Sequence, residues 1–234
     1  VSSLVFARAV APLSKSRTFA EILPSLYKKP SCSYDQILSA VEFIGSEYEK
    51  FIEIFTVATE DNYGIDTSNT YFDCTNFYFE IDKETDFKRK GPSKENRKDP
   101  IVGMGLLLDA NMIPIGMRMF PGNESEKPVL RETVSSLKER NNIEGRTIQI
   151  ADKGLNCAQN IIEAVNNNDG YIFSKSVKQL KDKEKLWALL DDGFVEVKDR
   201  NGNLLYKYKS CIDDFKYEYT DKDGHKVSKT IKEK

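Results

Sequence analysis

YFDCTNFYFE (71–80) is the stretch of sequence that decides the fold. It is aromatic and β-prone throughout, which predicts a strand. It also carries one carboxylate, Asp73, among apolar neighbours. Burying an ionised carboxylate costs free energy unless a partner compensates its charge. A divalent cation would compensate it, and so would a backbone cap or an arginine partner, so the strand alone leaves these interpretations of Asp73 open.

Two further strands are expected directly after this one. Residues 102–108 form a continuous apolar run, as in a buried strand, and residues 109–111 fit a turn. Residues 113–120 then return as a strand, so the two segments predict a β-hairpin. The Pro-Gly-Asn sequence at 121–123 stops the sheet.

Beyond the hairpin the pattern alternates between helix and strand. Ser125 is placed to cap one helix, and Asn156 is expected to cap a second. Between them, residues 147–151 form a short apolar strand, and residues 171–174 form another after the second helix. Three adjacent strands followed by this alternation predict an α/β fold: an RNase H-like mixed sheet flanked by helices.

Asp152 stands where the strand at 147–151 ends and a turn leading into a helix begins. In α/β sheets, ligands usually bind beyond the carboxyl ends of the strands. An aspartate that merely starts a helix would occupy the same place, so position alone does not decide its role. Asp73 and Asp152 are 152 − 73 = 79 residues apart, and only the fold can bring them together.

The segments on either side of this central region differ from it. Residues 1–60 are predicted to be an N-terminal helical segment, in which Ser33 and Gln36 have the spacing of a capping box. Residues 65–175 would form the α/β core. Residues 176–234 contain two turn sequences between short β-prone runs, and they predict a C-terminal β-rich region.

Composition excludes several classes of site. The four cysteines are scattered without a C-x-x-C pair, and the chain has one histidine, so a Cys/His zinc site is not expected. Any metal would be a hard cation held by carboxylates. The net charge of −2 leaves DNA binding to local patches. No apolar run approaches the ~20 residues that span a bilayer, so no membrane partner is expected.

Three blocks of this sequence resemble consecutive blocks of bacterial insertion-sequence transposases of the DDE type. They are YFDCTNFYFE (71–80), GMGLLLDANMIPIGMRMFPGNESEK (103–127) and IADKGLNCAQN (150–160). The family shows an Asp-x-Thr strand, a glycine-rich hairpin ending in Pro-Gly-Asn, and an Asp-Lys/Arg-Gly turn. The resemblance covers about residues 65–175, and it implies that this range is part of an RNase H-like catalytic core.

The resemblance implies metal-dependent phosphoryl transfer, that is, DNA strand cleavage and joining during transposition. Asp73 and Asp152 would be the catalytic and metal-binding residues, at a site for two Mg²⁺ or Mn²⁺ ions in the full-length protein. The implied partners are double-stranded DNA, at the transposon ends and the target, and a second copy in a synaptic complex. The implied location is the bacterial cytoplasm, in association with the nucleoid.

In that family the third acidic ligand is a glutamate on a later helix. Glu196, Glu218 and Glu233 lie in strand-like or terminal sequence instead. Residues 176–234 resemble the β-rich insertion that precedes this helix in the family. Because the chain begins at Val1 and ends in a lysine-rich run, we expect it to be a fragment. The glutamate would then lie beyond Lys234, and this fragment alone would be inactive.

A basic loop at 88–98 is the main candidate for DNA contact. It contains six cationic residues and one acidic residue, Glu95. Such positive charge neutralises phosphates without reading bases. Lys153, beside Asp152, is a further candidate, although a solvated loop remains the alternative. The cations of the basic loop are Lys88, Arg89, Lys90, Lys94, Arg97 and Lys98.

Two other functions stay open at this point. One is a different RNase H-like nuclease, and the other is a catalytically inactive, DNA-binding remnant of a mobile element. A distal helix with a glutamate followed by a basic residue would favour the transposase over the other nuclease, and an intact downstream reading frame would argue against the remnant.

Overall fold

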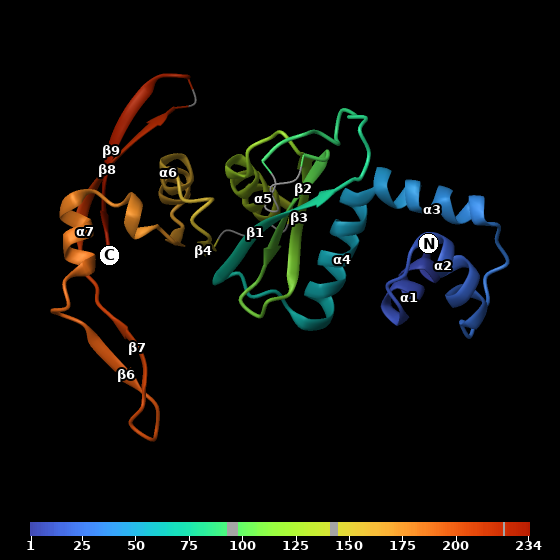
Figure 1. Cartoon of the computed structure of the whole chain (residues 1–234), viewed down its shortest axis with the longest axis horizontal. Coiled ribbons are helices and arrows are strands. Elements are labelled where there is room, and N and C mark those ends of the chain that lie inside the picture. The colour runs from blue at the N-terminus through green and yellow to red at the C-terminus, as the bar shows by residue number, and fades with distance from the viewer. Residues whose placement is uncertain (93–97, 141–144, 222) are drawn as a thin grey trace. The chain divides into compact units, whose positions relative to one another are not determined.

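The computed structural model describes residues 1–92, 98–140, 145–221 and 223–234 (Figure 1). The chain divides into two compact units, Val1–Gly64 and Ile65–Lys234. Among the described residues, no helix is both long and apolar enough to cross a bilayer.

The first unit is helical and has a small core of its own. Ala7, Leu23 and Ile37 are buried together. The predicted capping box is confirmed: the Gln36 amide donates to Ser33 Oγ at 3.3 Å, and the Ser33 amide donates to Gln36 Oε1 at 2.9 Å. The helices are α1 (Ser2–Val10), α2 (Lys15–Arg17), a π-helix (Thr18–Ile22), a 3₁₀ turn (Leu23–Ser25), α3 (Tyr34–Ser46) and α4 (Tyr48–Tyr63).

The second unit contains a five-stranded mixed sheet with the strand order β3-β2-β1-β4-β5. β1 pairs antiparallel with β2 and parallel with β4, and β4 pairs parallel with β5. The predicted mixed α/β architecture is therefore confirmed. The strands are β1 (Asn69–Tyr78), β2 (Ile101–Leu108), β3 (Pro114–Pro121), β4 (Ile148–Ala151) and β5 (Gly170–Phe173).

Two helices, α5 (Glu126–Arg140) and α6 (Ala158–Asn166), connect the strands on either side of β4. Crossovers between parallel strands are right-handed, so both helices are expected on one face of the sheet. In agreement, α5 packs on β2 and β3, and Arg131 of α5 donates to Asn160 Oδ1 of α6. Ser125 caps α5 as predicted, because its Oγ accepts the Lys127 amide at 3.4 Å.

The main core lies between the sheet and these helices. Successive residues of β1 point to opposite faces, so Phe72 and Cys74 are buried against α5 while Asp73 between them is not. Val129 and Leu130 supply the facing side chains of α5. The core therefore occupies one face of the sheet and leaves the Asp73 face for other contacts.

Asp109 closes the hairpin between β2 and β3 from inside the protein. Its side chain is fully buried, and its carboxylate accepts the backbone amides of Asn111 at 2.9 Å, Ile113 at 2.8 Å and Asp66 at 3.2 Å. One buried carboxylate thus stabilises the hairpin turn and the segment that leads into β1.

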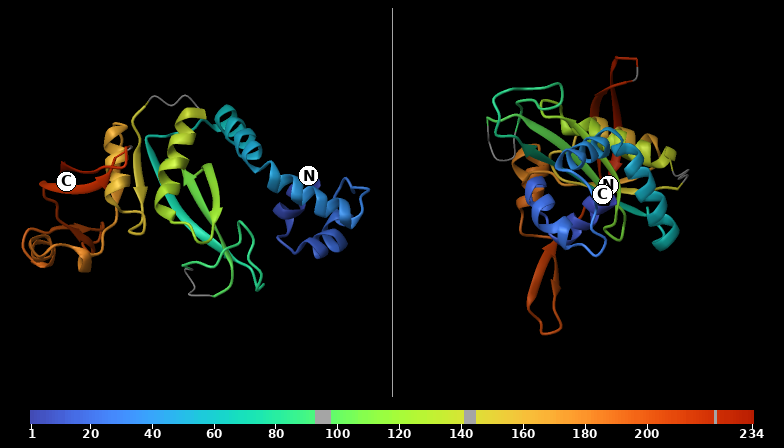
Figure 2. Two further views of the ribbon diagram at one scale, coloured as in Figure 1. Left: turned by 90° about the horizontal axis from the view of Figure 1, so that it is seen from above. Right: turned by 90° about the vertical axis from the view of Figure 1, so that its right-hand side faces the viewer.

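The C-terminal part adds one helix and two hairpins, each hairpin forming its own two-stranded sheet. Both hairpins were predicted, whereas α7 was not, because its sequence DKEKLWAL has no apolar face. Figure 2 shows the β8–β9 hairpin beside α6. The elements are a 3₁₀ turn (Val177–Gln179), α7 (Asp182–Leu189), β6 (Val195–Lys198), β7 (Leu204–Tyr208), β8 (Asp213–Thr220) and β9 (Lys226–Glu233).

Two hydrogen bonds tie the β8–β9 hairpin to β5 and α6, and a third joins its own two strands. Glu233 Oε1 accepts hydrogen bonds from the hydroxyl of Tyr171 on β5 and from that of Tyr217 on β8, the latter at 2.7 Å. Lys229 Nζ donates to Asn166 Oδ1 at the end of α6 at 2.9 Å. The hairpin is therefore anchored on β5 and α6.

Candidate functional site

The register between β1 and β4 brings the two predicted aspartates to neighbouring positions. Phe72 pairs with Ala151 in parallel; Asp73 is the next residue on β1, and Asp152 directly follows the end of β4. Phe72 and Ala151 belong to the core, so side-chain alternation turns Asp73 and Asp152 to the opposite face. Both aspartates are exposed. Two carboxylates remote in sequence thus share one face of adjacent strands.

Asp73 differs in one respect from what the sequence suggested. Its apolar neighbours implied a buried carboxylate, but Phe72 and Cys74 are 3% and 1% exposed while Asp73 itself is exposed. The apolar residues belong to the core face of the strand, and alternation separates Asp73 from them. Its Oδ1 accepts the Cys74 amide at 2.8 Å. The desolvation argument for a cation at Asp73 is therefore wrong, and the case for the site is geometric.

Asp152 begins a tight turn at the end of β4. The Leu155 amide donates to the Asp152 carbonyl at 3.0 Å, and the Asn156 amide donates to the Lys153 carbonyl at 3.3 Å. Beneath the turn, buried Asn160 donates from Nδ2 to the Leu155 carbonyl at 2.7 Å. The turn that Asp152 begins is thus held by two backbone hydrogen bonds of its own and by one from Asn160 of α6.

Asn156 does not cap α6 as predicted. The helix begins at Ala158 after Cys157, and Asn156 Nδ2 donates instead to the Ser174 carbonyl at 3.1 Å. Ser174 in turn donates from Oγ to Asp152 Oδ1 at 2.9 Å. Sequence reasoning missed Ser174 as part of this site. Its one signal was its position as the last residue of the strand predicted at 171–174.

The donor set matches a hard divalent cation, because carboxylate oxygens are the ligands that Mg²⁺ and Mn²⁺ prefer. Among the described residues, no acidic, histidine or cysteine side chain joins Asp73 and Asp152 in a group whose ligand atoms all lie within 4.8 Å of one another. Glu184 is a glutamate on the helix α7, and its Oε2 forms an ion pair with Lys175 Nζ at 3.5 Å. Among the described residues, Asp73 and Asp152 are thus the two carboxylates that the register brings to this face.

The basic loop lies at the edge of the sheet toward which β1 and β4 run. Arg89 exchanges backbone hydrogen bonds with Ile101 at the start of β2, at 3.1 and 2.8 Å. A Cβ added to Gly91 would lie 1.9 Å from the carbonyl oxygen of Gly122, in the turn after β3. These close backbone contacts fix the first half of the loop against the sheet.

The structure describes some of the residues that were predicted to bind DNA. Lys94 and Arg97 lie outside the described residues. Lys88 Nζ lies 4.6 Å from the centre of the Phe79 ring, which makes it a cation–π partner there. Of the predicted DNA-binding residues, those that are exposed are Lys90, Lys98 and Lys153.

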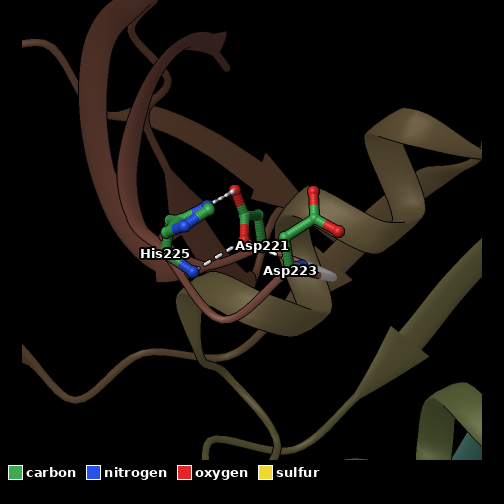
Figure 3. Close-up of side chains that lie close together, drawn as sticks. All are labelled: Asp221, Asp223 and His225. Carbon is green, nitrogen blue, oxygen red and sulfur yellow. Dashed lines mark hydrogen bonds and ion pairs between the residues drawn. The ribbon is translucent and has the colours of Figure 1, made fainter.

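A second cluster of potential ligands occurs in the β8–β9 turn, where Asp221, Asp223 and His225 lie together (Figure 3). Asp221 Oδ1 accepts the amides of Asp223 at 3.0 Å and His225 at 2.8 Å. In the β6–β7 turn, Asp199 Oδ1 accepts the amides of two asparagines in the same way. Because the pattern recurs without the histidine, it belongs to the turn, and we assign no metal to it.

Comparisons with known proteins complete the description. No protein-family model matches the chain, and no curated protein sequence matches it. Two transposase structures are similar in part. The Mos1 transposase paired-end complex with left transposon end has 10% identity and a TM-score of 0.33, over 73% of this chain and 57% of that one. The piggyBac transposase synaptic complex with hairpin DNA has 11% identity and a TM-score of 0.44, over 95% and 52%.

The chain thus spans little more than half the length of either structure. Similarities at this level do not identify a family.

Proposed function

We propose that this chain carries two of the three carboxylates of a DDE-type transposase of the insertion-sequence kind, and that it serves metal-dependent cleavage and joining of DNA strands. The observation that carries the proposal is the placement of Asp73 and Asp152. They follow the paired residues Phe72 and Ala151 on adjacent parallel strands, and they share one face. The three sequence blocks that resemble this family place its first two acids at the same positions.

The spacing of the strands suits a shared cation. Neighbouring strands lie about 4.8 Å apart, and side chains at equivalent positions point to the same side. Asp73 and Asp152 would hold Mg²⁺ or Mn²⁺ through their carboxylate oxygens. When bound, the cation would stabilise the charge on the attacking and leaving oxygens of a phosphoryl transfer. The aspartates contribute negative charge and fixed positions, so both must be ionised to act.

The arrangement of the sheet supports an RNase H-like core. The chain forms a three-stranded antiparallel part, β1 to β3, and then adds β4 and β5 in parallel through α5 and α6. This is the order of elements expected from the sequence for that fold. It puts the end of β4, and with it Asp152, next to the middle of β1.

Exposed cations on the same edge support DNA as the substrate. Lys90, Lys98 and Lys153 would contact phosphates, which positions a duplex without reading its sequence. The third carboxylate of the set is proposed to lie beyond Lys234, so activity would require the longer protein and a second copy in a synaptic complex. A bacterial, nucleoid-associated location is part of the same proposal.

Binding of Mn²⁺ to this chain, followed by electron paramagnetic resonance, tests the site directly. Asp73→Asn and Asp152→Asn remove the charge and keep the shape, so we expect each to abolish saturable Mn²⁺ binding while the melting temperature stays that of the wild type. Asp214→Asn, an exposed aspartate on β8, is the matched control and should bind as the wild type does. Wild-type Mn²⁺ affinity in both site variants would refute the proposal.

The DNA reaction separates the remaining alternatives. In the protein extended through its third carboxylate, a transposase should both cleave transposon-end DNA and join the 3′-hydroxyl to a target. Cleavage without joining would indicate another RNase H-like nuclease, and DNA binding without either step would indicate an inactive remnant.

A further inference from the structure

Ser174 extends the row of site residues onto a third strand. Ala151 pairs with Phe72 on one side and with Phe173 on the other, so the row Phe72–Ala151–Phe173 crosses β1, β4 and β5. The next residues along the chain are Asp73 on β1, Asp152 directly after β4 and Ser174 directly after β5. Because side chains alternate, Ser174 shares the face of the two aspartates.

Ser174 is joined to the segment that carries Asp152 by three hydrogen bonds. Its amide donates to the Ala151 carbonyl at 3.2 Å, and its carbonyl accepts Asn156 Nδ2 at 3.1 Å. Its Oγ donates to Asp152 Oδ1 at 2.9 Å. The two backbone contacts hold the residue still, so the hydroxyl is presented to the carboxylate from a fixed position.

From this geometry we propose that Ser174 is a positioning residue that orients the Asp152 carboxylate for binding a divalent cation. The inference rests on the proposed function of Asp73 and Asp152. A hydroxyl has one hydrogen to donate, and here it is directed at a carboxylate oxygen. Without this hydrogen bond, the side chain of Asp152 is freer to rotate about its χ angles. Cation binding must then order the side chain, and the entropy lost in doing so weakens the binding.

A purely structural role would look different. Ser174 and Asp152 are both exposed, and an exposed hydrogen bond contributes little to the free energy of unfolding. Groups that hydrogen-bond to metal ligands, by contrast, typically change metal affinity by 10- to 100-fold when removed. Metal affinity and thermal stability therefore separate the two roles.

The test measures Mn²⁺ affinity and melting temperature for three variants of the whole chain. We expect Ser174→Ala to weaken Mn²⁺ binding about 10-fold. Ser174→Thr keeps the hydroxyl and should restore binding to within about twofold of the wild type. Ser176→Ala is the matched control, since the Ser176 side chain makes no capping hydrogen bond to the turn that follows it. All three should melt within about 2 °C of the wild type, because Ser174 is exposed, Ser176 is only partly buried, and small substitutions at such positions change stability little.

The possible outcomes distinguish this inference from the proposal on which it rests. Wild-type Mn²⁺ affinity in Ser174→Ala, together with lost binding in Asp152→Asn, would overturn the positioning role and leave the metal site standing. Equal losses in the alanine and threonine variants would overturn it as well, because the hydroxyl would not be the cause. Unchanged binding in Asp73→Asn and Asp152→Asn would remove the proposed function and this inference together.

Discussion

Phe72 on β1 and Ala151 on β4 are paired in parallel register, and both side chains lie in the main core. This pair determines where Asp73 and Asp152 stand. A slip of one residue between the strands would move a whole set of side chains to the other face of the sheet. Apolar packing on one face thus sets the positions of the carboxylates on the other. Substitutions in the core should therefore change Mn²⁺ binding at Asp73 and Asp152.

Gly105 tests this coupling from β2. A Cβ at this position would lie 2.5 Å from Cζ of Phe72 and 3.0 Å from Cγ1 of Val129. Gly105→Ala should therefore displace Phe72, lower the free energy of unfolding by about 1–3 kcal/mol and weaken Mn²⁺ binding. Urea denaturation and Mn²⁺ titration measure the two effects. Gly145→Ala, with no atom within 4 Å of the added Cβ, is the control, and equal stability of the two variants would contradict the argument.

Loss of the Asp109 carboxylate should destabilise the second unit. Asp109→Ala leaves three backbone amides without their buried acceptor, which we expect to cost about 2–4 kcal/mol of unfolding free energy. Asp109→Asn keeps one acceptor oxygen for Asn111 and Ile113 and should lose less. Chemical denaturation gives both values. If the alanine variant were as stable as the asparagine variant, the carboxylate would not be holding the hairpin.

The contact of Tyr171 and Tyr217 with Glu233 should make docking of the β8–β9 hairpin sensitive to high pH. Burial, and then the hydrogen bond and charge of Glu233, raise the pKa of both phenols above the ordinary value of about 10. The folded state therefore favours the protonated phenols. Their contribution to stability is fully present below pH ~10 and is lost as the pH rises toward the raised pKa values.

Ultraviolet titration of tyrosinate would show this directly. Of the eleven tyrosines, two should ionise later than the rest in the folded protein. Glu233→Gln keeps an acceptor and removes the charge, so the late fraction should move to lower pH. A late fraction that is unchanged in the double variant Tyr171→Phe/Tyr217→Phe would disprove the assignment.

Lys90 and Lys98 should contribute to the salt dependence of DNA binding. If each neutralises one phosphate, replacing both by glutamine should reduce the slope of log K against log[salt] by about 1.8, or ~0.9 per contact. The matched control replaces Lys198 and Lys207, which both pair with Glu196, at 3.1 and 3.2 Å. Fluorescence anisotropy over a range of salt concentrations gives the slopes. An equal slope in all three proteins would mean that the basic loop is merely solvated.

Local sequence was sufficient for the elements whose signal lies within a few residues. The capping box of Ser33, the cap at Ser125 and both C-terminal hairpins appear where they were predicted. Prediction failed where a distant partner competes for a side chain. Asn156 has the sequence position of a helix cap, but its side-chain amide donates to the carbonyl of Ser174, directly after β5. Ser174 is remote in sequence, so no local pattern could have predicted this hydrogen bond.

The sequence by itself determined the kind of sheet and the order of its elements, because periodicity and turn residues act over short distances. It also offered Asp73 and Asp152 as candidates, through the resemblance of three blocks to a known family. Only the tertiary structure decided that Asp73 is exposed, that Asp152 stands beside it and that Ser174 contacts Asp152. These facts depend on the register between strands far apart in the chain. Register is set by how Phe72, Ala151 and their neighbours pack in the core, which is a property of the whole fold.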